Sequence, residues 1–430
     1  MKQFIATGLL TTITFFSFAQ KIDKIINARE VERIEKTLSA DDMRGRNAFK
    51  PADIDKAAAF IASEFASIGL QPWKNSSTGY RQEFSMVTPK SISVSAVLDG
   101  VVADTKNIVV ITTQPTVKIT EQSAFEKISI PAGANLFQEA YKYVGKNKNY
   151  LVLVDTSFSK NFPRLSGFKR NLFQSSNSTV FILTATDPSK FEIEAKHEIT
   201  ETKLANVVGV IPGKTKPDEF VIFSGHYDHL GIGKPENGDS IYNGANDDAA
   251  GTTAVIMLAK YFKKARPKNA RTLVFAAFTA EEEGGFGSQY FSKQFNADSV
   301  MAMFNIEMIG TESKWGTNTA YITGYEKTDM GKILEKNLEG TQFKFYPDPY
   351  TEQQLFYRSD NATLARLGVP AHTISTSKMD NEPNYHKASD EIQTLDMKNM
   401  AMIIKAIAKS SASIVSGKDS PTRVNTADLK

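Results

Sequence analysis

The chain has 430 residues, a formal net charge of +3 and no cysteine. This length predicts two to three domains, and a content of 41% hydrophobic and 23% charged residues is typical of a globular protein with a large core. The small net charge argues against nucleic acid as the main partner. Without cysteine there can be no disulfide, thiolate metal site or cysteine nucleophile, so any metal chemistry must use carboxylates and the five histidines.

Residues 1–19 have the pattern of a secretory signal peptide. Lys2 precedes an apolar run, and Ser17-Phe18-Ala19 resembles a small-x-small cleavage site. The run is too short and too rich in threonine for a membrane span, and no later segment is apolar over about 18 residues. We therefore expect a protein exported to the periplasm or secreted, with no membrane span; a buried N-terminal helix is the alternative.

The next two segments differ in their hydrophobic pattern. Residues 20–85 show helical spacing, first at Val31, Ile34 and Leu38 and then in an alanine-rich stretch that ends near Gly69. Residues 86–200 are instead expected to form a strand-rich insert, because short alternating or β-branched runs recur in them. These runs lie at 91–98, 108–112, 150–154 and 180–183.

Residues 201–418 alternate between strand and helix patterns. The expected strands are 220–224, 272–278, 300–308, 321–323 and 371–375, and the expected helices are 248–264, 288–295, 361–367 and 396–411. This alternation predicts an α/β fold with a mixed, largely parallel sheet flanked by helices. The polar tail, residues 419–430, is expected to be loose.

Five segments with histidine or carboxylate side chains follow predicted strands or lie in nearby loops. In open α/β sheets, ligand sites form at the carboxyl ends of the strands. Each segment alone has a plainer explanation, such as a helix cap or a salt bridge, but together they offer nitrogen and oxygen ligands that suit zinc. The segments centre on His226-Tyr227-Asp228, Asp247-Asp248, Glu281-Glu282-Glu283, Glu307 and His386. Asp228 is placed to hold the second ring nitrogen of His226, whereas His229 is expected to be loop structure and His197 and His372 have no assigned role.

The order of these motifs resembles a known family of di-zinc exopeptidases. The motifs are HYDHLG (226–231), GANDDAAG (244–251), AEEEGGFGS (280–288), NIEMIG (305–310) and YHKASD (385–390). They resemble metallopeptidase family 28, which includes aminopeptidase Y, plasma glutamate carboxypeptidase and glutamate carboxypeptidase II. The resemblance spans about residue 204 to the C-terminus, and residues 38–46 look like the family's N-terminal segment.

The resemblance implies a role for each motif. His226 and Glu307 would bind one zinc ion, Glu282 and His386 the other, and Asp247 would bridge the two. The family spacing Glu-Glu-x-Gly makes Glu281 the general base, and Tyr385 matches a position that stabilises the oxyanion. The family also tends to have a cis peptide bond after the bridging aspartate. The implied protein is an aminopeptidase that removes N-terminal residues from peptides through a water bridging two zinc ions.

Three departures from the family pattern leave alternatives open. The family usually has aspartate at the position of Glu307, so one zinc ion rather than two is an alternative, and Ser359-Asp360-Asn361 stands where many members have Ser-Asp-His. The insert matches the family's protease-associated domain only by position. A single-zinc glutaminyl-cyclase-like acyltransferase is one alternative function. A carboxypeptidase or dipeptidase is another, with Arg358 as a candidate for binding a free carboxylate, and a binding protein on an inactive scaffold is the third. Peptides are the expected partners, and the sequence does not indicate an oligomeric state.

Overall fold

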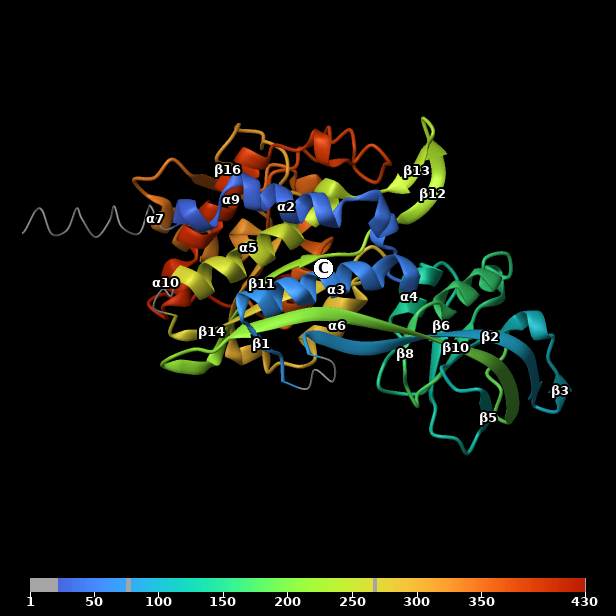
Figure 1. Cartoon of the computed structure of the whole chain (residues 1–430). Helices are drawn as coiled ribbons and strands as arrows, with labels where there is room; N and C mark the ends of the chain where they lie inside the picture. The colour runs from blue at the N-terminus through green and yellow to red at the C-terminus, as the bar shows by residue number, and fades with distance from the viewer. Residues whose placement is uncertain (1–21, 75–78, 266–268, 430) are drawn as a thin grey trace, which may run out of the picture. The chain divides into compact units, whose positions relative to one another are not determined.

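The computed structural model describes residues 22–74, 79–265 and 269–429. The predicted signal peptide, residues 1–19, lies outside this part of the chain. The described residues form two compact units. One unit combines the chain up to Glu83 with the chain from Ala205 onward, and the other is Phe84–Leu204 (Figure 1). These division points lie next to the expected insert boundaries at 86 and 200. No helix among the described residues is long and apolar enough to cross a membrane.

Two helices open the first unit, as predicted. Helix α2 (Ala28–Leu38) begins at Asn27, whose side chain accepts a hydrogen bond from the Glu30 amide. Helix α3 (Pro51–Ile68) begins with proline, which has no amide to leave unsatisfied. It ends at Gly69, where φ is +80° and a side chain would be disfavoured.

A mixed, largely parallel sheet forms the centre of the first unit, which confirms the predicted fold class. Strand β11 (Lys216–His226) pairs in parallel with β14 (Arg271–Phe278) and with β15 (Val300–Ile306). Strand β15 continues in parallel to β18 (Ala371–Ser375), and β16 (Thr319–Ile322) runs antiparallel to β18 but parallel to β17 (Lys344–Pro347). At the other edge, β10 (Phe191–Ile211) pairs antiparallel with β14.

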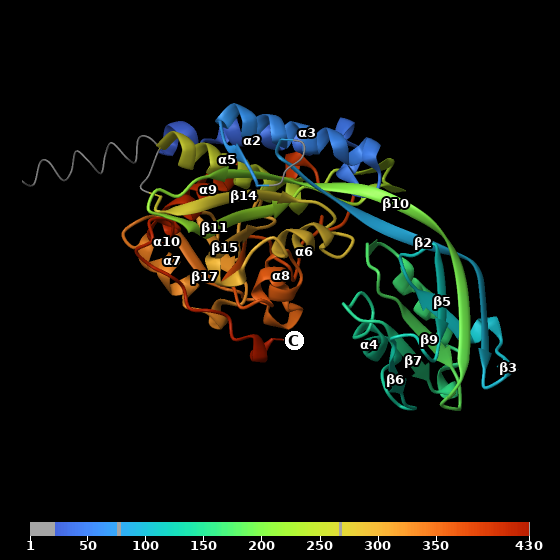
Figure 2. The same cartoon turned by 90° about the horizontal axis from the view of Figure 1, so that it is seen from below.

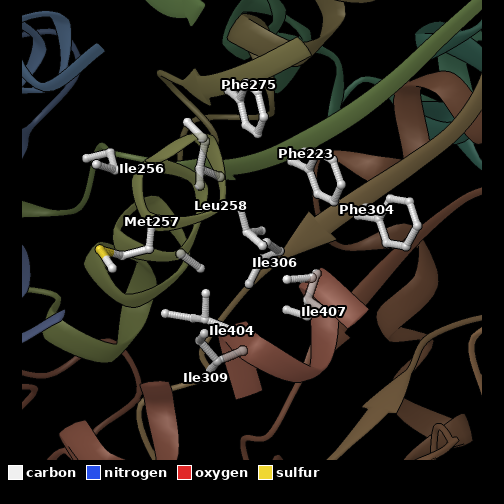
Figure 3. Packing of buried hydrophobic residues seen from close by; sticks show 14 of the residues in the cluster. Phe223, Ile256, Met257, Leu258, Phe275, Phe304, Ile306, Ile309, Ile404 and Ile407 are labelled. Carbon is white, nitrogen blue, oxygen red and sulfur yellow. The ribbon is translucent and has the colours of Figure 1, made fainter. Parts of the chain in front are cut away.

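Helices cover both faces of this sheet. On one face, α5 (Ala250–Ala265) and α9 (Met397–Ser410) pack against the stacked rings of Phe223, Phe275 and Phe304 (Figure 3). On the other face, α6 (Phe286–Ser292) and α8 (Asn361–Ala365) join a second buried cluster, and Figure 2 shows α8 on the side opposite α2 and α3. Near-complete burial of β14, β15 and residues 221–226 of β11 explains the continuous apolar runs in these strands.

Element boundaries shift in ways that matter for the site. His226 is the last residue of β11 rather than a residue just past the strand, because its parallel pairing with Phe278 extends the expected strand by two residues. Strand β15 ends at Ile306, so Glu307 follows the strand instead of interrupting it. Helix α5 begins at Ala250, after an irregular turn over Ala245–Ala249 in which Asp247 and Asp248 have non-helical backbone angles.

Some elements and contacts were not predicted from the sequence. A hairpin of β12 (Gly231–Glu236) and β13 (Asp239–Tyr242) turns at Asn237-Gly238, both with positive φ, and helix α7 spans Met330–Leu338. The expectation of a loose tail is wrong for residues 419–429. Arg423 donates to the carbonyls of Ala297 and Val300, and the Val424 amide donates to the Gly368 carbonyl.

The second unit contains the predicted short strands. Strands β4 (Ile108–Ile111), β9 (Thr179–Leu183), β7 (Tyr150–Val154) and β6 (Glu126–Ile130) form a four-stranded sheet in that order. The expected strand at 91–98 is the end of a longer one, β2 (Arg81–Leu98). Helix α4 (Leu136–Tyr141) packs on the small sheet through Leu136 and Ala140.

Candidate active site

Three neighbouring parallel strands end at the same edge of the sheet and carry the candidate ligands there. His226 ends β11, Glu281 and Glu282 follow β14, and Glu307 follows β15. Because these strands pair in parallel, their carboxyl ends meet, and this is the edge at which α/β sheets bind ligands. The loops that carry Asp247 and His386 complete the site.

The first group of candidate metal ligands is His226, Asp247 and Glu307. Their ligand atoms all lie within 4.8 Å of one another. His226 Nε2 is 3.2 Å from Asp247 Oδ1, yet neither His226 Nε2 nor Glu307 Oε2 makes a hydrogen bond, although both atoms are buried. Ligand atoms that approach one another without hydrogen-bond geometry are expected where they converge on a shared cation.

The second group is Asp247, Glu282 and His386. His386 Nε2 lies 3.3 Å from Asp247 Oδ2 and 3.1 Å from Glu282 Oε2. Asp247 therefore faces His226 with one oxygen and His386 with the other, which is the arrangement required of a bridging carboxylate. The peptide bond between Asp247 and Asp248 is cis, as the resemblance implies.

His229 belongs to this site, contrary to the expectation that it is loop structure. Its ring is buried, and its Nδ1 lies 2.7 Å from Glu282 Oε1. Although His229, Asp247 and Glu282 also cluster within 4.8 Å, a separation of 2.7 Å is a hydrogen-bond distance. We therefore assign Oε1 of Glu282 to His229 and Oε2 to the position shared with His386. A second histidine three residues after the first in HYDHLG was the available sequence signal.

Asp228 holds the site together in a different way from the one expected. Its carboxylate is 3.7 Å from Nδ1 of His226, which is too far for a hydrogen bond, and Nδ1 instead lies 3.2 Å from the Asp228 backbone carbonyl. The Asp228 carboxylate accepts the backbone amides of Glu281 and Glu282, at 3.1 and 3.4 Å. Asp228 thus fixes the turn after β14, because those two amides have no strand partner there.

Two further aspartates, which the sequence analysis gave no role, connect the ligand loops. The Asp248 carboxylate accepts the amides of His226, Gly251 and Met308, and so joins three of the five motifs. The Asp390 carboxylate accepts the amides of Asn246 and Asp247 at 2.8 and 3.0 Å. Each of these buried carboxylates orders a loop by accepting its backbone amides. The adjacent residues Asp247 and Asp248 thus have different partners: Asp247 faces the ligand groups, and Asp248 accepts backbone amides.

The electrostatics of the site favour a bound cation. Burial raises the pKa of Asp228 and of Glu307 to about 7, and it raises the pKa of Glu281 as well. Burial would also raise the pKa of Asp247, but the close approach of His226 and His386 lowers it well below its usual range. Among the described residues these acids have only histidine ion-pair partners, with no lysine or arginine. Divalent cations compensate such clusters, and the imidazole and carboxylate donors fit zinc.

Glu281 and Tyr385 lie next to the candidate ligands. Glu281 Oε2 is 4.0 Å from His226 Nε2, so its carboxylate borders the ligands without completing either group. The Tyr385 ring stacks on the His386 ring at 3.9 Å, and its hydroxyl accepts a hydrogen bond from Arg358. Burial and the neighbouring carboxylates raise the pKa of Tyr385 above its usual range, so its hydroxyl keeps a proton to donate at neutral pH.

A pocket adjoins the first ligand group. Glu307 and Tyr385 line it, together with Met308, Tyr321, Thr323, Leu355, Arg358, Ser359, Thr373, Ser375 and Met379. Three of its hydroxyl groups donate to other protein groups: Tyr321 to the Ser377 carbonyl, Ser375 to the Met308 carbonyl and Thr373 to Asn361. The pocket wall therefore combines apolar side chains, such as Met308, Leu355 and Met379, with the charged groups of Glu307 and Arg358.

Comparisons with known proteins agree with the fold. Residues 206–411 match the model of peptidase family M28. The chain contains a peptidase family M28 domain. A zinc metalloprotease of Pyricularia oryzae, named "Probable zinc metalloprotease", is 35% identical over 113 residues, which cover 26% of this chain and 22% of that protein. "Leucine aminopeptidase 1" of Metarhizium robertsii is 24% identical over 286 residues, which cover 61% of this chain and 69% of that protein.

Solved structures share the fold at low sequence identity. An aminopeptidase from Aneurinibacillus sp. strain AM-1 has a TM-score of 0.54 and 17% identity, with 95% of this chain and 97% of that chain covered. A zinc aminopeptidase from Bacillus subtilis has a TM-score of 0.53 and 15% identity, with 94% and 99% covered. At this identity the likeness concerns the fold. The matched segments span only about a quarter of the first zinc metalloproteases, 22% and 28% of two of them.

Proposed function

We propose that this protein is an exported, zinc-dependent aminopeptidase. The observation that carries the proposal is the shared Asp247, whose two carboxylate oxygens face one ligand group each, at 3.2 Å from His226 and 3.3 Å from His386. The names of relatives and of structural neighbours, which include leucine and zinc aminopeptidases, support the same activity. Export is proposed from the signal-like sequence of residues 1–19.

The metal would occupy the two groups that share Asp247. His226 and Glu307 would hold one zinc ion, Glu282 and His386 the other, and Asp247 would contribute to both. Zinc bound there would supply Lewis acidity, which acidifies a water molecule and polarises a peptide carbonyl.

The residues of the chain would then divide the proton and charge transfers between them. Glu281 would accept the proton of the attacking water and pass it to the leaving amine, because its carboxylate borders the ligands but belongs to neither ligand group. Tyr385 would donate its hydroxyl hydrogen to the oxyanion that develops on the carbonyl. Asp228 and His229 would keep Glu281 and Glu282 in place through the contacts described above.

The pocket beside Glu307 indicates which N-terminal residues would be preferred. Since the hydroxyls of Tyr321, Thr373 and Ser375 donate within the protein, an apolar side chain against Met308, Leu355 and Met379 would not leave those hydroxyls unsatisfied. We expect leucine, methionine and phenylalanine to be preferred over lysine and arginine. Arg358 on the pocket wall favours a second candidate, a dipeptidase that binds the free carboxylate of a short substrate.

A panel of aminoacyl-nitroanilides and short peptides tests the proposal. Release of the N-terminal amino acid, loss of that activity with a chelator and recovery with zinc are expected. N-terminal acetylation of the same peptides should abolish cleavage. Cleavage confined to dipeptides would favour the dipeptidase, cyclisation of an N-terminal glutamine would favour a cyclase, and no turnover by a zinc-loaded protein would refute the proposal.

A further inference from the structure

Arg46 contacts the ligand loops from the buried side. It is the last residue of the short helical segment η1 (Asp41–Arg46), and its side chain is 0% exposed. Its guanidinium donates to four backbone carbonyls. Nε donates to Tyr227 at 2.7 Å, Nη1 to Leu38 at 2.7 Å and to Asn243 at 2.5 Å, and Nη2 to Gly244 at 2.9 Å.

Three of these carbonyls belong to the two loops that supply the shared ligands. Tyr227 lies between His226 and Asp228, and Asn243 and Gly244 directly precede the turn that carries Asp247. The carbonyl of Arg46 itself accepts the amide of His229 at 3.2 Å. One residue from the N-terminal segment therefore joins loops that lie about 180 and 200 positions later in the sequence.

Gly45 allows Arg46 to reach this position. Its φ is +65°, and a Cβ atom there would lie 2.5 Å from the Gly231 carbonyl oxygen and 2.6 Å from the Tyr242 carbonyl oxygen. Both are backbone atoms of the hairpin β12–β13, so they cannot move aside as a flexible side chain could. Only glycine fits at position 45, and this close approach to the hairpin places Arg46 where its side chain reaches the loop carbonyls.

The bonding of Arg46 differs from that of a structural ion pair. The carboxylates of Glu35, Asp228, Asp390 and Asp247 act on it through charge alone, without a hydrogen bond. The planar, forked guanidinium instead reaches carbonyls in different directions, which the single nitrogen of lysine cannot do. The contacts therefore constrain the relative positions of backbone segments.

We propose that Arg46 is a positioning residue of the metal centre, which holds the His226 loop and the Asp247 loop at the separation that metal binding requires. The inference rests on the proposed metal centre but not on the proposed peptidase activity. If Arg46 were only a structural tie, its replacement would lower thermal stability and leave the zinc affinity of the folded protein unchanged.

Zinc affinity of the apoprotein, measured by competition with a chromophoric chelator, tests this role. Arg46→Lys should weaken zinc binding by about 10–100-fold, the range found when groups that orient metal ligands are removed. Arg46→Met, which also loses the charge, should weaken it at least as much. Circular dichroism checks that each variant is folded.

Arg271 provides a matched control. It is also 0% exposed, and its guanidinium donates to the carbonyls of Ile414 and Asp419, at 2.7 and 2.6 Å. It begins β14 and therefore lies roughly 23 Å, at about 3.3 Å per residue, from Phe278, the end of the strand that precedes the site. Arg271→Lys should lower the melting temperature but keep zinc affinity within twofold. Folded Arg46→Lys with wild-type zinc affinity would overturn the proposal.

A measurement on the wild-type protein remains decisive even if the Arg46 variants do not fold. Coupling between the Arg46 contacts and metal binding is reciprocal. Zinc must therefore stabilise these contacts by the same free energy with which they favour zinc binding. Hydrogen exchange of a peptide covering residues 38–47 should therefore slow at least tenfold when zinc is added. Unchanged exchange there, while zinc protects residues 243–251, would refute the proposal. A wild-type protein that binds no zinc would refute the metal centre itself.

Discussion

Nδ1 of His229 lies 2.7 Å from Oε1 of Glu282, and Oε2 of the same carboxylate lies 3.1 Å from Nε2 of His386. The two oxygens of Glu282 are therefore used differently: one is held by a buried imidazole and the other faces the second ligand group. A hydrogen bond of this kind fixes the orientation of a ligand before the metal arrives.

His229→Ala should weaken zinc binding at the position shared by Glu282 and His386. The Glu282 carboxylate would lose its hydrogen bond to His229 and rotate more freely. A loss of about 10–100-fold in zinc affinity is therefore expected. Zinc content after equilibration with a weak chelator measures the effect. His197→Ala in the second unit serves as the control, and full zinc content in His229→Ala would contradict the assignment.

Variants of single ligands should separate the two metal positions. Glu307→Ala should retain zinc at the Glu282 and His386 position, and His386→Ala should retain it at the His226 and Glu307 position. Asp247→Ala should lose both ions, because its oxygens serve both groups. Elemental analysis gives the stoichiometry of each variant. One zinc in the wild type and none in Glu307→Ala would instead support a single-metal centre, while two zinc ions in Asp247→Ala would exclude a bridge.

Glu281→Gln should keep both zinc ions but lose turnover by about a hundredfold or more, since general acid–base catalysis contributes about 10²–10⁴-fold. The amide preserves the shape of the side chain but cannot take a proton from water. Hydrolysis of leucyl-nitroanilide and zinc content are measured on the same sample. Glu283→Gln, at an exposed position of the same run, should behave as the wild type; activity of Glu281→Gln near that of Glu283→Gln would refute the role.

The sequence was most informative where one pattern determines one structure. The buried strands β14 and β18 and the helices α3, α5 and α9 were predicted within a few residues, because continuous apolar runs and helical spacing leave few alternatives. Three of the five motifs converge because parallel strands bring their ends together, which follows from the fold class alone.

What could not be predicted depends on contacts between distant segments. The carboxylate of Asp228 bonds to amides some 53 positions away rather than to the nearby ring of His226. The same holds for Asp248, Asp390 and Arg46, whose partners are backbone groups with no sequence signature. His229 was expected to be a loop residue. Its contact with Glu282 could not be predicted, because it depends on where the chain lies after β14.

His372 should make the folded protein less stable as the pH falls from 7 to 5. It is buried in β18, where Nδ1 lies 2.8 Å from the Thr323 carbonyl and Nε2 lies 2.7 Å from the Thr328 hydroxyl. Burial lowers the pKa of His372 from 6.5 to about 4. Above pH 6.5 the ring is neutral in both states. Below that pH the unfolded chain takes up a proton that the folded protein excludes, so protonation favours unfolding.

The expected loss between pH 7 and pH 5 is about 2 kcal/mol, from about 1.36 kcal/mol per pKa unit. Other buried acids also titrate in this range, so the informative quantity is the difference from His372→Gln, which offers an amide donor and acceptor but no titration. Urea unfolding at both pH values gives the free energy of unfolding of each protein. The wild type should lose about 2 kcal/mol more than the variant over this interval. Parallel pH dependences would show that His372 takes up its proton over the same pH range in the folded and unfolded states and would contradict the prediction.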